Sequence, residues 1–459
     1  MKNRINSRYR SPHLFYRLVL MPALALSALA LADGPTALND VTVETYYSLS
    51  PQLEGALSGF DLDNEGNLHF SLGDPDWGLQ CDVYRCSSEG KETLVYTSNE
   101  VFAGFVTVIG SNVYFNDGGD YMRNDYNFFL YDAAQPGEAL DLLIAPYGAS
   151  LGSIARRYDA ELFGVGSDFT WGPAALFYSP LNRSGFLEDG TLRNIGDIGE
   201  SPGPMAFDRV GNLYYAHGYV FSGAADVFRW TAAEVNAALE DSETHPLRPD
   251  TAQWATLPEG YGATGMAADD AGNVFLTATA WLSPSHLLAY NATTAAELPL
   301  LQYGDRLGAV RYHEGFLYVN SAESIFRIPL LQTLSHLAEE ETRIHVAPGE
   351  PVVMTLNPVC GVGEKQYQWY RLTQDKSAVP VGGNTAHHTF TATSEDDGAI
   401  FYCIVSDALT TVESSHFTVS VQAPVPAASI WAAFLLVLLL CALIPYRARI
   451  TPKRNTRRM

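Results

Sequence analysis

Acidic, amide-bearing and large aromatic side chains recur along this chain in short polar stretches, where several of them could bind one ligand. The candidate ligand-binding residues are Asp74, Asp76, Trp77, Asp117, Asp120, Asp168, Trp171, His217, Tyr219, Trp281 and His286. Carboxylate oxygens are ligands that suit Ca²⁺, and exposed aromatic faces suit sugar rings or apolar ligands. Asp is also common in turns, and Trp and Tyr often pack in cores, so the same residues have a purely structural interpretation.

Repeated β-hairpins are the elements that would position these residues. Residues 201–218 predict a strand at Met205–Phe207, a tight turn at Asp208–Asn212 and a second strand at Leu213–Ala216. Copies of this hairpin lie at 60–70, 106–115, 154–163, 266–276 and 310–319. The equivalent turn positions are Gly66, Ser111, Ala160, Gly211, Gly272 and Gly315, with spacings of 45, 49, 51, 61 and 43 residues. A period in this range with β-type units predicts a propeller.

We therefore expect an all-β fold with a six-bladed β-propeller over residues 41–332. The blades would cover roughly 55–100, 101–147, 148–199, 200–260, 261–304 and 305–332. The sixth repeat is short, so the alternating segment 41–49 should complete it and remove an exposed sheet edge. The longest interval contains Thr231 and Glu234 in the spacing of a capping box, which predicts a short helix through Leu239. The candidate residues would then follow the second strand of each blade, at the end opposite to the turns.

The turns resemble those of NHL and SMP-30/gluconolactonase-like propellers, whose blades carry a D-x-x-G-N-L-Y pattern. That pattern stands here at 63–69, 208–214 and 269–275, and the resemblance covers residues 55–330. It implies the propeller architecture. It also raises the alternative of a metal-dependent lactonase-like hydrolase, because SMP-30-like hydrolases hold a metal with Glu, Asn and Asp in the channel. No Glu of this chain maps onto that site, and the zinc-protease motif H-E-x-x-H is not present in the sequence.

Residues 342–422 carry strand-like segments at the spacing of a β-sandwich. Cys360, Trp369 and Cys403 stand in the order found in immunoglobulin-like domains, which this segment resembles; the resemblance implies a Cys360–Cys403 disulfide. Two features depart from that pattern: Phe401 replaces the corner tyrosine, and the interval from Cys360 to Trp369 is short. Cys81 and Cys86 could close a second, small disulfide loop. Residues 333–341 would be the linker between the two domains.

Charge is distributed unevenly along the chain. Residues 33–446 hold 17 basic and 51 acidic residues, a formal charge of −34, whereas both ends are basic. A body so negative repels phosphate backbones, so we expect no nucleic-acid partner. The charge is compatible with divalent cations, of which Ca²⁺ is the cofactor we consider, and equally with a purely solubilising role.

The two ends predict export and anchoring. Residues 1–32 combine a basic start with an apolar run that ends in small residues, as a signal peptide does; the alternative is an uncleaved anchor. Residues 427–446 form an apolar segment that predicts a transmembrane helix, and residues 447–459 form a basic tail that should stay cytoplasmic. The tail resembles PEP-CTERM and IPTL-CTERM sorting signals at Val425, Pro426, Ser429 and Trp431. This resemblance implies an exosortase-type processing enzyme, while a plain single-pass anchor explains the same composition.

From these features we expect a bacterial protein anchored in the cell envelope with its body facing outward. It would bind or adhere to a glycan or protein at the cell surface, with the immunoglobulin-like domain as a spacer. The metal-dependent hydrolase remains the alternative, and a scaffold role in an envelope complex is a third interpretation.

Overall fold

The computed structural model describes residues 34–439 in two compact units. The residues outside the description in this range are 77, 100–101, 118–127, 136–140, 144–149, 159, 168–172, 189–191, 200, 219–223, 281–282, 332–341, 357–359, 374 and 423–433. The first unit contains residues up to 332 with Cys360–Lys365 and Asp407–Thr410, and the second contains the rest. The expected signal peptide, linker, basic tail and sorting motif (Val425, Pro426, Ser429 and Trp431) lie outside the described residues.

The expected membrane segment 427–446 is described only at residues 434–439, which are helical and exposed. Among the described residues, no helix combines the length and the apolar character needed to span a membrane.

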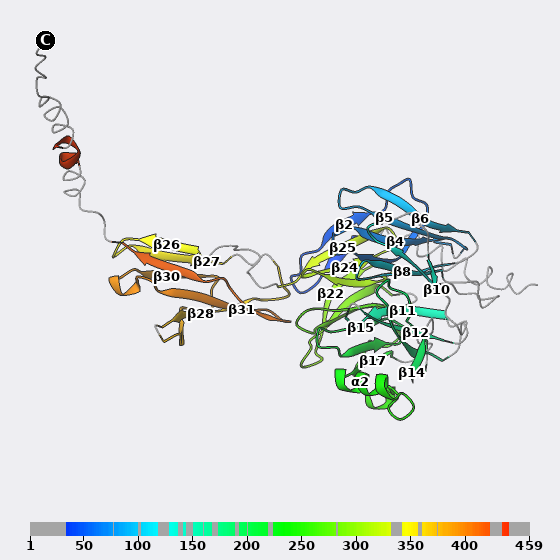
Figure 1. Cartoon of the computed structure of the whole chain (residues 1–459). Helices are drawn as coiled ribbons and strands as arrows, with labels where there is room; N and C mark the ends of the chain where they lie inside the picture. Colours follow the sequence, from blue (N-terminus) through cyan, green and yellow to red (C-terminus); the bar gives the residue numbers. More distant parts are fainter. Residues whose placement is uncertain are drawn as a thin grey trace, which may run out of the picture. The chain divides into compact units, whose positions relative to one another are not determined.

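The first unit consists of six antiparallel sheets in which the strands follow one another in chain order (Figure 1). The first three sheets are β3 (Ala56–Leu62), β4 (Leu68–Gly73), β5 (Cys81–Cys86) and β6 (Glu92–Ser98); β7 (Ala103–Ile109), β8 (Asn112–Asp117), β9 (Phe128–Asp132) and β10 (Asp141–Leu143); and β11 (Ser150–Arg156), β12 (Glu161–Ser167), β13 (Ala175–Pro180) and β14 (Arg193–Asp197). The next two are β15 (Met205–Phe207), β16 (Leu213–Ala216), β17 (Asp226–Trp230) and β18 (Gln253–Thr256); and β19 (Gly262–Ala268), β20 (Val274–Thr279), β21 (Ser285–Tyr290) and β22 (Glu297–Tyr303). The sixth contains β23 (Val310–His313), β24 (Phe316–Asn320) and β25 (Ser324–Pro329). The fold is all-β and propeller-like, as the repeats predicted.

A strand from the N-terminal side completes the sixth sheet. β2 (Glu44–Ser48) pairs antiparallel with β25, which confirms the expected closure by the segment at 41–49. Arg327 of β25 donates to Glu44 of β2 at 2.6 Å and reinforces this pairing. A further strand, β1 (Thr36–Ala37), pairs with β22 as a fifth strand of the fifth sheet, which the sequence did not predict.

Apolar side chains from neighbouring sheets form the core of this unit. Phe163 and Phe207, on the third and fourth sheets, lie 4.6 Å apart between ring centroids. Burying one such side chain contributes about 1.5–3 kcal/mol. The insertion between β17 and β18 contains α2 (Ala232–Glu240), and both hydrogen bonds of the Thr231–Glu234 capping box are present, as predicted. A 3-10 helix, η1 (Pro249–Thr251), follows it.

The second unit consists of two sheets. The larger has the order β26 (Thr342–Val346), β33 (Phe417–Val421), β31 (Ile400–Ser406), β28 (Gln366–Leu372) and β29 (Ala378–Val381), with β32 (Thr411–Glu413) paired to β31. The smaller pairs β27 (Pro351–Thr355) with β30 (His387–Thr391), and η3 (Ser394–Asp396) precedes β31. Trp369 is fully buried and donates its indole N–H to the carbonyl of Thr385 at 2.9 Å.

Both disulfide predictions are wrong for the described residues. Cys360, which follows β27, and Cys403, which lies on β31, are both free thiols. Cys81 and Cys86 are the first and last residues of β5. An extended strand of this length separates its ends by about 16 Å, far beyond the reach of a disulfide.

Candidate functional site

The turns that carry the repeated acidic motif are held by the acid itself. In the first sheet, Asp63 Oδ1 accepts the backbone N–H groups of Glu65 and Asn67, both at 2.9 Å, and Oδ2 accepts Asn67 Nδ2 at 2.8 Å. The same three hydrogen bonds recur around Asp208 and Asp269. Three hydrogen bonds to each carboxylate fix the turn, so these acids serve the hairpin.

The asparagine of the motif joins the turn to the far side of its own sheet. Its Oδ1 accepts a backbone N–H from the connection between the third and fourth strands, at 3.3, 2.9 and 3.1 Å for Asn67, Asn212 and Asn273. The donors are Ser88, Ala232 and Ala292. The D-x-x-G-N pattern is thereby explained by structure at all three places.

His69 adds a buried polar chain to the first of these turns. Its Nε2 lies 3.1 Å from Asp63 Oδ2, and its Nδ1 lies 2.7 Å from the hydroxyl of Tyr131 on the second sheet. Burial acts to raise the pKa of Asp63, but the hydrogen bonds from His69 and Asn67 outweigh it and hold that pKa below its usual range. Burial raises the pKa of Tyr131. His69 is fully buried, so this chain fastens two sheets together and does not meet a substrate.

Polar side chains also fasten the innermost strands of successive sheets. We call β3, β7, β11, β15, β19 and β23 the inner strands, because together they line one central cavity. Side chains of second strands donate to carbonyls in, or just before, the inner strand of the next sheet: Ser71 to Gly104 at 2.8 Å, Asn116 to Leu151 at 2.9 Å, Thr277 to Gly308 at 2.6 Å and Asn320 to Leu57 at 3.1 Å. Between the third and fourth sheets Ser153 donates to Gly203, and between the fourth and fifth the carbonyl of His217 accepts the N–H of Ala263. The ring of six sheets is thus closed by hydrogen bonds.

The inner strands come close together because they carry glycine where they approach. A Cβ on Gly59 would lie 2.9 Å from the backbone nitrogen of Val106, and one on Gly265 would lie 2.4 Å from the carbonyl oxygen of Gly308. The pairing of four inner strands with their neighbours shifts register beside these positions, between Leu57/Gly59, Ala103/Val106, Leu151/Ser153 and Ala263/Gly265. Bulges of this kind turn the extra residue out of the ladder, here toward the centre of the ring.

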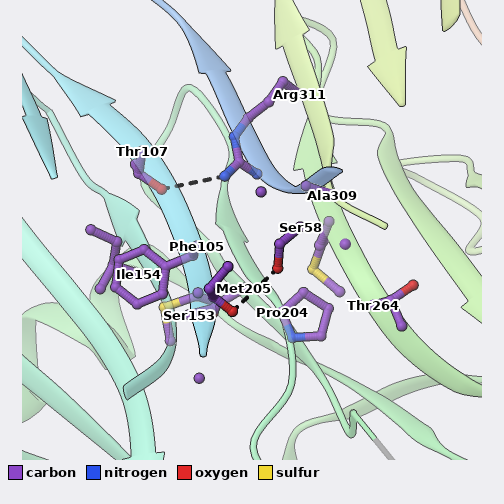
Figure 2. A pocket seen from close by; sticks show the side chains of 16 residues that line it. Ser58, Phe105, Thr107, Ser153, Ile154, Pro204, Met205, Thr264, Ala309 and Arg311 are labelled. Carbon is purple, nitrogen blue, oxygen red and sulfur yellow. Dashed lines mark hydrogen bonds between the residues drawn. The ribbon is translucent and has the colours of Figure 1, made fainter. Parts of the chain in front are cut away.

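A central cavity of about 260 Å³ lies between the inner strands (Figure 2). Hydroxyl groups of Ser58, Thr107, Ser153 and Thr264 line it, together with apolar side chains and glycine backbone. Arg311 of β23 is the ionisable side chain of the described lining. The cavity therefore combines contributions from all six sheets at the place where a propeller-like ring leaves most space.

The arginine is held in place by three hydrogen bonds. Arg311 Nη1 donates to the carbonyl of Val310, and Nη2 donates to the carbonyl of Val106 and to the hydroxyl of Thr107, which Figure 2 shows beside it. Its Nε lies 3.4 Å from Asp61 Oδ2. The guanidinium thereby bridges the sixth sheet to the first two.

Four of the residues predicted to bind a ligand have described side chains. Asp74 accepts the backbone N–H of Asp76 at 2.7 Å in an exposed turn after β4. His217 follows β16, is buried and lies 5.0 Å from Phe228 between ring centroids. His286 is half-buried on β21, where burial lowers its pKa, and its ring lies 5.6 Å from that of Tyr261.

The remaining predicted residues cannot be placed together with these four. Asp117 ends β8 but its side chain is outside the description, and so are Trp77, Asp120, Asp168, Trp171, Tyr219 and Trp281. None of the four described side chains lines the central cavity. The cavity was not singled out in the sequence, although its glycines and small residues precede the inner-strand core residues in each repeat.

The metal site implied by the propeller resemblance does not fit the described lining. Carboxylates and imidazoles are absent from the described residues around the cavity, and the charged group there is a guanidinium, which repels cations. Elsewhere in the described residues, no group of three or more His, Cys, Asp or Glu side chains is arranged to hold a metal ion.

Comparison with known proteins gives distant likenesses in structure. No family model matches the chain, and no curated protein matches it. Virginiamycin B lyase from Staphylococcus aureus has a TM-score of 0.42 at 9% identity, over 64% of this chain and 100% of that one. A mutant of AofleA from Arthrobotrys oligospora has 0.39 at 8%, over 84% and 94%. Prolyl oligopeptidase B from Galerina marginata has 0.39 at 9%, over 85% and 58%. Likenesses this distant transfer no activity to the chain.

Proposed function

We propose that the protein binds a glycan or protein ligand outside the cell, through the loops that follow the second strand of each blade of a six-bladed propeller. The observation that supports this is the difference between the two ends of the sheets. The first and second strands are joined by two to five residues, whereas the second and third are joined by three to ten. Long, variable loops on a rigid scaffold are where binding residues concentrate.

The loop end also carries the side chains suited to recognition. At the turn end, the carboxylates of Asp63, Asp208 and Asp269 are held in hydrogen bonds within their own sheets, so they are not available to a ligand. At the loop end the sequence places acids and three tryptophans, Trp77, Trp171 and Trp281. Aromatic faces with nearby carboxylates are suited to sugar rings and to polar protein surfaces.

The decisive experiment compares matched variants of the full chain. Trp171→Ala and Trp281→Ala remove aromatic faces at the loop end, and Val210→Ala removes an exposed apolar side chain at the turn end. The full chain, purified in detergent, is applied to glycan and surface-protein arrays. We expect a ligand whose binding falls at least about tenfold in the tryptophan variants and is unchanged in Val210→Ala. Ligand binding that is insensitive to both loop variants contradicts the proposal.

We further propose that the chain is exported and anchored in the cell envelope with its body facing outward. The basic, apolar N-terminal segment and the apolar segment followed by six basic residues support this topology. The second unit, with Trp369 buried between two sheets, would then be an immunoglobulin-like spacer. Protease digestion of intact cells should remove the body, and loss of a C-terminal tag in vivo would indicate exosortase-type processing. Resistance of the body in cells whose outer layer has been opened would contradict this topology.

A further inference from the structure

The central cavity differs in charge from the rest of the molecule. The body carries a formal charge of −34, with 51 acidic residues against 17 basic ones. Arg311 is nevertheless the charged side chain of the described cavity lining, which contains no carboxylate. Its Nε is paired with Asp61 Oδ2 at 3.4 Å, so the Nη groups are the part of the guanidinium that remains to be explained.

The guanidinium keeps donor capacity for a ligand. Arg311 has five N–H donors, of which four are on its Nη atoms. Three of those four have acceptors, Val310, Val106 and Thr107. The carboxylate of Asp61 lies beside Nε at 3.4 Å and also accepts the backbone N–H groups of Leu62 and Val108, so one N–H of Nη1 remains for a ligand.

Hydroxyl groups of the cavity lining are hydrogen-bonded to backbone carbonyl groups. Ser58 donates to Ala103 at 3.3 Å, Ser153 donates to Gly203 at 3.1 Å, and Thr264 donates to Leu307 at 2.8 Å. Each of these hydroxyl groups uses its only proton in that bond, which leaves its oxygen as an acceptor; Thr264 Oγ1 also lies 2.9 Å from the hydroxyl of Thr277. The lining thus offers a cationic donor at Arg311 and neutral acceptors on the other inner strands.

We propose that this cavity binds a small carboxylate that also carries hydroxyl groups. The carboxylate would accept from Arg311, and the ligand hydroxyls would donate to the oxygens of Ser58, Ser153 or Thr264. A neutral donor is favoured over an ammonium group, because no acid lines the described cavity. At about 260 Å³ the cavity lies just below the range of drug-sized pockets, which restricts the ligand to a few carbon atoms. This site is separate from the loop-end surface and does not depend on it.

Two methionines of the lining provide local probes for the test. Met205 and Met266 both line the cavity, whereas Met354 lies on β27 in the second unit. The full chain is labelled with ¹³C at the methionine methyl groups and titrated with glycerate, propionate or glycerol at equal ionic strength. The signals are assigned with Met205→Leu and Met266→Leu. We expect saturable shifts of the Met205 and Met266 signals with glycerate, weaker ones with propionate and glycerol, and none at Met354.

Two variants test the assignment in different ways. Arg311→Gln removes the charge and should weaken glycerate binding by about tenfold to a hundredfold, because charged hydrogen bonds contribute most. Ala309→Leu fills the cavity without changing its charge and should abolish the shifts, which keeps the test valid if Arg311→Gln does not fold. Arg327→Gln, which breaks an ion pair with Glu44 outside the cavity, is the matched control and should bind normally. Equal responses to glycerate and glycerol, or binding that survives Ala309→Leu, overturn the proposal.

Discussion

The side-chain amide of Asn320 donates to the backbone carbonyl of Leu57 at 3.1 Å, and so joins the last sheet of the ring to the first across 263 residues of sequence. The same Nδ2 also donates to the carbonyl of Ser321 at 3.1 Å. Asn320 is buried, so neither carbonyl has water as an alternative partner. This residue acts at the junction between the sixth and first sheets, where the chain itself passes from one sheet to the other between β2 and β3.

Replacing Asn320 by alanine should destabilise the propeller-like unit. The substitution leaves two buried carbonyls without their donor, and each unsatisfied group of this kind costs about 1–3 kcal/mol. We expect the free energy of unfolding in urea, followed by tryptophan fluorescence, to fall by at least about 1 kcal/mol with an unchanged m-value. Asn194→Ala is the control: its side chain is exposed and bonds locally to Asp197. Equal losses in the two variants would show that ring closure does not depend on Asn320.

Much of the first unit could be predicted from the sequence, because its repeats are local. A hairpin with apolar flanks and a turn glycine is specified by about a dozen neighbouring residues, and six copies define the ring. The capping box at Thr231–Glu234 was predictable for the same reason. β1 was not, since two residues added to the edge of the fifth sheet leave no periodic pattern.

The candidate site was harder to predict, because it depends on contacts between repeats. Ser71, Asn116, Thr277 and Asn320 each stand five positions after the turn position of their repeat, and this regularity could have revealed the ring of hydrogen bonds. Arg311 gave no such signal, because the equivalent positions in other repeats hold unrelated residues such as Asp61 and Thr107. Its role appears only when the sixth sheet is placed beside the first two.

Asp63 and Asp269 occupy the same position in two turns but should respond oppositely to pH. Hydrogen bonds from His69 and Asn67 lower the pKa of Asp63 in spite of its burial, whereas burial raises the pKa of Asp269. A lowered pKa stabilises the fold above the unfolded value of about 3.9, and that stability is lost as the pH falls through the folded pKa. A carboxyl group with a raised pKa acts in the opposite direction: its contribution to the stability of the fold is present at low pH and is lost as the pH rises through the folded pKa.

At neutral pH, Asp63→Asn should therefore lower the free energy of unfolding more than Asp269→Asn does. The side-chain amide introduced by Asp63→Asn would place an N–H donor where Asn67 and His69 now donate to the carboxylate. We expect the free energy of unfolding to fall by about 1.5–3 kcal/mol. Urea unfolding between about pH 3 and pH 7 should show the gap between wild type and Asp63→Asn shrinking toward acid. A gap that stays constant with pH would mean that the ionised carboxylate is not what stabilises this turn.

Gly66→Ala tests whether the repeated turn requires glycine for its backbone. Gly66 has a φ of +76° and no atom within 4 Å of an added Cβ, so any cost comes from the conformation alone. We expect the stability of the fold to fall by about 1–2 kcal/mol, the usual cost of placing a residue with a side chain in the left-handed backbone region, and this loss should appear as a lower Tm. At Gly304 a Cβ also meets nothing within 4 Å, and the residue lacks a positive φ of this kind. Gly304→Ala should therefore be nearly neutral; a drop equal to that of Gly66→Ala would remove the conformational explanation.

The thiols of the described residues should react in an order set by burial, without any reducing step. Cys81 and Cys403 are fully buried, and burial raises the pKa of Cys403 to about 12, so its thiolate is scarce at neutral pH. Cys360 is partly exposed and should be alkylated first by iodoacetamide in the folded full chain. Peptide mass spectrometry should find Cys403 modified only after urea is added, because a thiol with that pKa is roughly ten-thousandfold depleted in thiolate at pH 8. If Cys360 and Cys403 were modified only after a reductant was added together with urea, the two thiols would be oxidised in the native protein. The protein would then contain a Cys360–Cys403 bridge, in place of the two free thiols of the structure.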